Sequence, residues 1–112
     1  MSGGSININK SELSVGENLV LSSGNLYVNG GKIFVGKDFR IQAQKVDYEG
    51  NIIFEGCYAY IQMLNKEDYI YVEGDFVTQS YYSDYYNRFN AGVLEVKGRF
   101  YTKNLWKQFI KL

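Results

Sequence analysis

The sequence predicts an all-β fold, a short right-handed parallel β-solenoid of about four coils with a C-terminal amphipathic cap helix. Three observations predict it. The 112 residues include eleven Tyr and seven Phe but no Pro, a composition that suits pleated, half-buried strands. Apolar and polar residues alternate with a period of two along most of the chain, which is typical of strands. One short apolar pattern also recurs four times.

The recurring pattern is a Val followed, four positions later, by a large apolar residue. Its copies are Val15-Gly-Glu-Asn-Leu19, Val35-Gly-Lys-Asp-Phe39, Val72-Glu-Gly-Asp-Phe76 and Val96-Lys-Gly-Arg-Phe100. Successive valines are 20, 37 and 24 residues apart, and the shorter spacings match the length of a β-solenoid coil. We therefore expect the four valines to stack in one inward row between coils, and Leu19, Phe39, Phe76 and Phe100 to stack in a second.

The residue midway between the Val and the large apolar residue predicts a bend. This residue is Glu17, Lys37, Gly74 or Gly98. In a straight strand it would face the same side as both apolar neighbours, and burying an unpaired charge costs several kcal/mol. We expect the chain to turn there, so that the charge faces outward.

Two features leave the topology open. The spacing of 37 residues predicts one coil plus an insertion, or nearly two short coils, with further strands at residues 51–54 and 60–64. Val28-Asn-Gly-Gly31 is also a good type I′ hairpin signal. An antiparallel β-meander or sandwich is therefore the alternative fold. Hairpins would place Val opposite Phe within one copy, whereas a solenoid places Val on Val between copies.

The two ends differ from the repeated part. Residues 1–10 are mainly Gly, Ser and Asn and predict a flexible segment without the apolar stretch of a signal peptide. The repeat domain is expected over residues 11–103. In residues 104–112, Leu105, Phe109 and Leu112 follow a helical spacing, which predicts a capping helix or a tail. Weak binding of this helix to a membrane surface is the rival interpretation.

Charge and hydropathy limit the partners. Residues 1–96 hold seven bases and twelve acids, and residues 97–112 hold five bases and no acid, so the total is zero. A mildly basic, solvated tail is not the basic patch of a nucleic-acid-binding domain, and we expect no nucleic-acid partner. No apolar run approaches the roughly 20 residues of a membrane span.

The sequence offers little for catalysis or metal binding. It has no His, and Cys57 is the single cysteine, expected to be a buried and inert thiol. Asp38, Glu73 and Asp75 lie at the predicted bends, where a calcium ion would need six or more oxygens. Asp75 with Glu95, or Asp38 with Glu73, could form a carboxylate pair like that of a polysaccharide-cleaving β-helix, but acidic residues at repeat bends are more often solvated. We predict no enzyme, no metal and no cofactor.

The densest aromatic segment lies at residues 80–89, between two repeat copies. It is predicted to be a loop that either covers the core or stacks on a sugar or peptide. The candidate ligand-binding residues are Tyr81, Tyr82, Asp84, Tyr85, Tyr86, Asn87, Arg88 and Phe89.

Five segments between residues 24 and 100 resemble a repeat of large bacterial surface or secreted proteins, the adhesin-like β-solenoids. They are Asn25-Leu-Tyr-Val-Asn-Gly30, Lys37-Asp-Phe-Arg-Ile-Gln42, Tyr60-Ile-Gln-Met-Leu-Asn65, residues 67–80 and residues 91–100. The resemblance implies a β-helical part of a long extracellular fibre, on the cell surface or secreted, with no catalytic residue. The lack of a signal peptide departs from that picture.

The leading functional expectation is a non-enzymatic structural module that acts as a rigid spacer or adhesion scaffold. Neighbouring repeats, or a second copy stacked end to end, are the expected partners. One alternative is a glycan- or protein-binding module that uses the Tyr-rich loop 80–89. Another is an intracellular scaffold that assembles with itself.

Overall fold

The structure is a computed structural model that describes residues 2–81 and 90–102. Three parallel sheets form most of it. Sheet A has the strands β1 (Ser2–Asn7), β4 (Ser23–Tyr27) and β9 (Tyr60–Gln62) in this order. Sheet B has the order β2 (Glu12–Val15), β5 (Lys32–Val35), β10 (Tyr69–Val72) and β12 (Val93–Val96). Sheet C has the order β3 (Leu19–Val20), β6 (Phe39–Ile41), β11 (Phe76–Thr78) and β13 (Phe100–Thr102).

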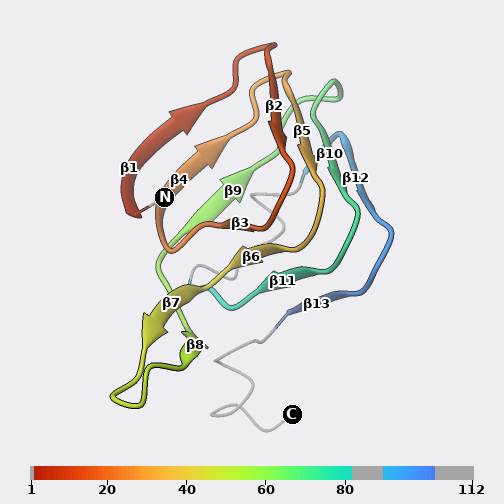
Figure 1. Cartoon of the computed structure of the whole chain (residues 1–112). Coiled ribbons are helices and arrows are strands. Elements are labelled where there is room, and N and C mark those ends of the chain that lie inside the picture. Colours follow the sequence, from red (N-terminus) through yellow and green to blue (C-terminus); the bar gives the residue numbers. More distant parts are fainter. Residues whose placement is uncertain (1, 82–89, 103–112) are drawn as a thin grey trace, which may run out of the picture.

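The chain visits these sheets in a repeating order. It passes through A, B and C three times, and a fourth passage adds β12 to sheet B and β13 to sheet C (Figure 1). We call each passage a coil and number the four coils along the chain. All pairings within the three sheets are parallel. The alternative prediction of an antiparallel meander or sandwich is therefore wrong for these sheets, because neighbouring strands come from successive coils.

The pairing register aligns the repeated apolar residues between coils. One row in sheet B consists of Val15, Val35, Val72 and Val96. One row in sheet C consists of Leu19, Phe39, Phe76 and Phe100. The rings of Phe39 and Phe76 are 5.2 Å apart, and those of Phe76 and Phe100 are also 5.2 Å apart.

Burial within these rows depends on the coil. Val35, Phe39, Val72 and Phe76, all from the second and third coils, are fully buried. Val15, Leu19 and Val96 in the end coils are only partly buried, and Phe100 is 50% exposed. Complete burial of such a side chain stabilises the fold by about 1.5–3 kcal/mol. The apolar rows therefore contribute most in the two central coils.

The chain bends between sheets B and C, at the residues between the two rows. Glu17 and Lys37 point outward there and form an exposed ion pair, with 2.5 Å between Nζ and Oε2. Gly74 and Gly98 take the same place in the next two coils. A Cβ on Gly74 would lie 2.9 Å from the carbonyl oxygen of Lys37, and one on Gly98 would lie 2.5 Å from that of Gly74. These two corners are too tight for a side chain.

The turn at Val28-Asn-Gly-Gly31 has the backbone of the predicted turn but not the predicted hairpin. Asn29 and Gly30 have φ values of 48° and 81°, and the Gly31 N–H donates to the Val28 carbonyl at 2.9 Å. Both central residues with positive φ define a type I′ turn. The flanking strands nevertheless enter sheets A and B, where each pairs with other coils. Ile8-Asn-Lys-Ser11 makes the corresponding turn in the first coil, with a bond of 3.1 Å.

The long spacing between Val35 and Val72 contains an insertion. Strands β7 (Ala43–Val46) and β8 (Ile52–Glu55) form an antiparallel hairpin that projects beside the sheets (Figure 1). The Asp47 carboxylate accepts the N–H groups of Glu49 and Asn51, each at 2.9 Å, and so closes the turn. Of the two further strands expected from the sequence, the first corresponds to β8, and the second contains β9, which belongs to the third coil.

The predictions for the two ends meet the structure differently. Residues 1–10 were expected to be flexible, whereas the structure has β1 there, paired with β4 through Ile6 and Leu26. A Gly- and Ser-rich sequence can form a strand when a neighbouring strand supplies its hydrogen bonds. The cap helix expected at residues 104–112 lies outside the described residues. No helix occurs within residues 2–81 and 90–102.

Candidate functional site

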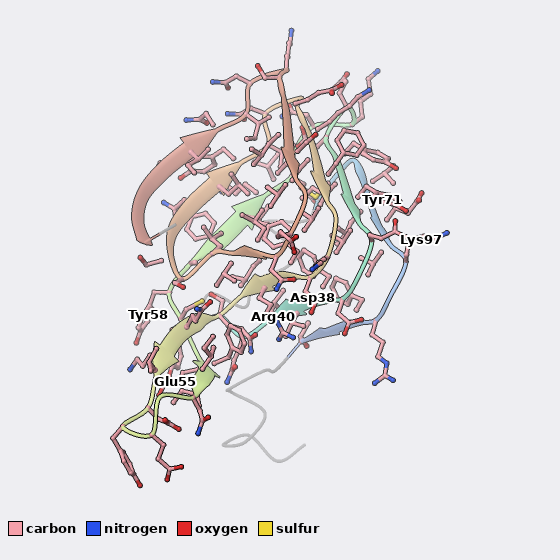
Figure 2. The ribbon with its side chains drawn as sticks, in the orientation of Figure 1. Asp38, Arg40, Glu55, Tyr58, Tyr71 and Lys97 are labelled. Atoms are coloured by element: carbon pink, nitrogen blue, oxygen red, sulfur yellow. The ribbon has the colours of Figure 1, made fainter. Side chains whose placement is uncertain are left out.

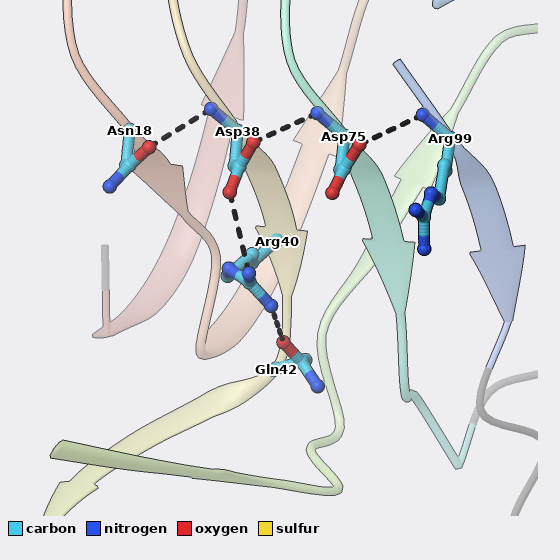
Figure 3. A network of polar contacts seen from close by, with 6 residues as sticks. All are labelled: Asn18, Asp38, Arg40, Gln42, Asp75 and Arg99. Atoms are coloured by element: carbon cyan, nitrogen blue, oxygen red, sulfur yellow. Dashed lines mark hydrogen bonds and ion pairs between the residues drawn. The ribbon is translucent and has the colours of Figure 1, made fainter.

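A ladder of side-chain hydrogen bonds runs along the corner between sheets B and C (Figure 3). The Asn18 side-chain oxygen accepts the Asp38 N–H at 2.9 Å, and the Asp38 carboxylate accepts the Asp75 N–H at 2.8 Å. The Asp75 carboxylate accepts the Arg99 N–H, also at 2.8 Å. Each coil thus supplies an acceptor for the backbone of the next one. We call this row the corner ladder.

The corner ladder is tied to the base of the hairpin through Arg40. Its guanidinium contacts the Asp38 carboxylate at 3.3 Å and donates to the Gln42 side chain at 3.1 Å (Figure 3). Gln42 is fully buried and donates to Gln79 of the next coil at 2.8 Å. The Arg40 guanidinium also lies 4.7 Å from the centre of the Phe54 ring in β8, within the range of a cation–π contact.

Of the acidic residues predicted for a calcium site or a carboxylate pair, Asp38, Glu73 and Asp75 accept hydrogen bonds, and Glu95 lies exposed in β12. Asp38 and Asp75 accept backbone N–H groups, as described above. Glu73 accepts a hydrogen bond from the Tyr71 hydroxyl at 2.5 Å, and this bond raises the pKa of Tyr71 to about 12. The described residues contain no group of three or more His, Cys, Asp or Glu placed to hold a metal ion. The Asp38 and Asp75 carboxylates thus join successive coils, whereas Glu73 bonds within its own coil.

Of the predicted ligand-binding residues, Tyr81 lies in the described part of the chain. Tyr82, Asp84, Tyr85, Tyr86, Asn87, Arg88 and Phe89 lie outside it. The Tyr81 ring stacks on the ring of Tyr58, with centroids 4.6 Å apart and planes 26° apart. Tyr58 is 62% exposed and Tyr81 is 39% exposed. Figure 2 shows Tyr58 at the side of the molecule, near the base of the hairpin.

Sequence reasoning missed Tyr58 as a site residue. It follows Cys57 directly, and the sequence supports a prediction only for the Cys57 thiol, which is expected to be buried. Cys57 itself is buried, and burial raises the pKa of its thiol. Alternation of inward and outward residues around Cys57 would have placed Tyr58 outside. Cys57 forms a parallel bridge with Ser80, and this bridge brings Tyr58 beside Tyr81.

The hairpin presents a second exposed apolar surface that the sequence did not indicate. Val46 and Ile52 are cross-strand partners and both are largely exposed. Tyr48 at the tip is 99% exposed. An ion pair between Lys45 and Glu55 joins the two strands at 2.8 Å. A well-ordered turn thus holds a large aromatic side chain in solvent, a position that suits contact with a partner.

The fourth coil contains a hollow beside the apolar core. Its volume is about 430 Å³. Sheet A has no described strand at this level. The residues lining the hollow are Met63, Asn90, Ala91, Gly92, Leu94, Phe100 and Thr102.

Comparison with known proteins finds no family model, no curated protein and no solved structure that matches this chain. Within the residues that the structure describes, no helix combines the length and apolar character needed to cross a bilayer.

Proposed function

We propose that this chain is a short right-handed β-solenoid that serves as a non-enzymatic structural module of a bacterial cell-surface or secreted protein. In this role it is a rigid spacer or adhesion scaffold. Its coils keep attached segments at a fixed separation, and its outer surface carries the contacts.

The parallel, in-register pairing of successive coils is the observation that carries this proposal. Sheets B and C continue through all four coils and sheet A through the first three, and the corner ladder adds one side-chain bond at each step. Coils held by three sheets and a ladder resist bending, because any bend opens several bonds at once. Stacked repeats of this kind gain stability from each neighbouring interface.

Rigidity can be measured between spin labels on the outermost strands of sheet B. Ser14 and Glu95 are exposed and lie in the same row, in β2 and β12. In a Cys57→Ala background, labels on Ser14→Cys and Glu95→Cys should give one narrow distance distribution. Three strand spacings put the two backbones roughly 14 Å apart. A broad or bimodal distribution in the folded protein would contradict a rigid spacer.

A matched control separates label motion from motion of the stack. Labels on Ser14→Cys and Tyr71→Cys, two strands apart in the same row, span fewer coils and so mainly measure the width contributed by the labels. The two distributions should have similar widths if the stack is rigid. Detection of the chain on intact cells of its source organism by antibody tests the proposed compartment, and detection only after lysis would contradict it.

Binding of glycans is a second candidate function, favoured by the exposed Tyr58–Tyr81 pair. Flat aromatic surfaces with hydroxyl groups suit stacking against sugar rings. On a glycan array, Tyr58→Ala and Tyr81→Ala should each abolish binding without lowering the melting temperature by more than a few degrees. Tyr48→Ala, which removes an exposed ring at the hairpin tip, is the matched control and should bind normally. Equal loss in all three variants, or no binding by the native chain, would exclude this function.

A further inference from the structure

The first coil exposes one edge of all three sheets on the same side of the molecule. Strands β1, β2 and β3 are the end strands of sheets A, B and C. We call their outer edges, together with the corner at residues 16–18, the leading face. The inward residue Ile6 is 39% exposed there, whereas its partner Leu26 in the second coil is 3% exposed. Leu13, Val15 and Leu19 are likewise only partly buried.

No contact among the described residues explains why position 16 is a glycine. Gly36 is the residue of the second coil that lies beside Gly16 in the stack. A Cβ on Gly36 would lie 2.6 Å from the Gly16 carbonyl oxygen. Stacking on the first coil therefore requires glycine at position 36. A Cβ on Gly16 would meet nothing within 4 Å, and its φ lies outside the left-handed region. A coil with the corner geometry of the second coil, stacked on the leading face, would bring a carbonyl to Gly16 as Gly16 does to Gly36. The third and fourth coils turn differently, with Glu73 and Lys97 in this row and the tight glycine one residue later, at Gly74 and Gly98.

The first member of the corner ladder, Asn18, also lies at the leading face. Asp38, Asp75 and Arg99 each donate a backbone N–H to the side chain of the preceding coil. No acceptor for the Asn18 N–H is found among the described residues. An Asn or Asp at the corner of a further coil would supply one.

The opposite end of the ladder does not offer such an acceptor. Arg99 occupies the corner of the fourth coil, and a guanidinium has donors only. A second copy stacked head to tail would present Arg99 to Asn18, so the ladder would be interrupted between copies. The leading face therefore fits a coil of another repeat better than it fits the fourth coil of this chain.

We propose that the leading face docks a parallel β-coil of a neighbouring repeat segment that carries Asn or Asp at its corner between sheets B and C. The proposal rests on the proposed function as a β-solenoid, and it adds the direction in which coils assemble and the two residues that select the partner. Docking continues the coil-to-coil interface already present between the first and second coils. Gly16 and Asn18 are its specificity-determining residues.

The test joins a second copy of residues 22–41 directly before residue 2 of the full chain, so that the added coil carries its own Asp38. Amide hydrogen exchange at Asn18 should slow about fivefold or more relative to the native chain, which is the change that one hydrogen bond of roughly 1 kcal/mol produces. An added coil in which Asp38 is replaced, Asp38→Arg, should leave Asn18 exchange within about twofold of the native rate. Equal rates in all three proteins would overturn the proposal.

Glycine substitutions give an independent measurement. In the native chain, Gly36→Ala should lower the melting temperature and Gly16→Ala should leave it unchanged. In the extended chain, Gly16→Ala should lower it as well. If Gly16→Ala is neutral in both chains while amides of β5 and β10 stay protected, docking fails and the solenoid proposal stands. If those amides exchange freely in the native chain, the solenoid proposal itself fails.

The native chain should sediment as a monomer at all concentrations. Oligomers of the native chain that Gly16→Val abolishes would show that a second copy occupies the leading face, and would overturn the proposed partner.

Discussion

The two central coils and the two end coils carry the same apolar pattern but bury it to different extents. Val35 and Val72 are fully buried, whereas Val15 and Val96 in the same row are partly exposed. The difference lies in the neighbours, since a central coil is covered on both sides and an end coil on one. In a stack of this kind, stability belongs to the interfaces between coils rather than to any one coil.

The largest expected effect is that of a charge in the central part of the valine row. Val72→Asp would place a carboxylate between Val35 and Val96 without a partner, at a cost of several kcal/mol. Because small domains are stable by only about 5–15 kcal/mol, we expect the variant to be largely unfolded in urea titrations that leave the native chain folded. Val15→Asp, at the partly exposed end of the row, should cost about 1–2 kcal/mol. Equal losses from the two variants would contradict the difference between central and end coils.

A smaller effect is expected from the corner ladder. Asp38→Ala removes the acceptor of the Asp75 N–H and the partner of Arg40, and we expect a loss of roughly 1–3 kcal/mol. Asn18→Ala removes only the acceptor of the Asp38 N–H at an exposed corner, where water replaces it, and should cost about 0.5–1 kcal/mol. Thermal unfolding of both variants measures the two losses of stability, which can then be compared. A larger loss from Asn18→Ala would mean that the first coil, rather than the second, anchors the ladder.

The smallest effect on stability is expected for side chains on the outer face of sheet B. These side chains are at least partly exposed in central and end coils alike. Figure 2 shows Tyr71 projecting outward from the third coil. The hydrogen bond to Glu73 raises the pKa of Tyr71 from 10.0 to about 12. The folded state then holds the phenol proton more tightly than the unfolded state does. This contribution to stability is complete below pH 10 and is lost as the pH rises toward 12.

An absorbance titration of tyrosinate tests this assignment. Glu73→Gln should lower the pKa of Tyr71 towards its ordinary value and leave the melting temperature at neutral pH nearly unchanged, because the pair is exposed. An unchanged late-titrating phenol in this variant would assign the raised pKa to another tyrosine.

The strands and the inward rows could be predicted because the residues of a single coil already show the pattern that marks them. The Val and Phe rows recur in every copy, and period-two alternation marks the strands around them. The turn at residues 28–31 shows where this reasoning stops. Its backbone is the predicted one, but a type I′ turn reverses the chain locally and does not decide whether the flanking strands pair with each other or with other coils.

The candidate surfaces were less accessible to prediction. Tyr58 and Tyr81 are far apart in sequence, and the bridge between Cys57 and Ser80 brings them together. The sequence also did not predict that β7 and β8 form a hairpin. Apolar and polar residues alternate only weakly in Ala43–Val46, and the turn of the hairpin depends on the Asp47 side chain. Contacts between distant residues leave no periodic trace in the sequence.

By itself, the sequence determined that the chain forms short strands with tight corners and that Val and Phe face inward. Both follow from local alternation and from the cost of burying charge. Only the tertiary structure decided the parallel direction of the sheets, the strand at residues 2–7 and the exposure of the first coil. Those features depend on which strand lies beside which, and a backbone hydrogen bond is available to any residue that a neighbouring strand reaches.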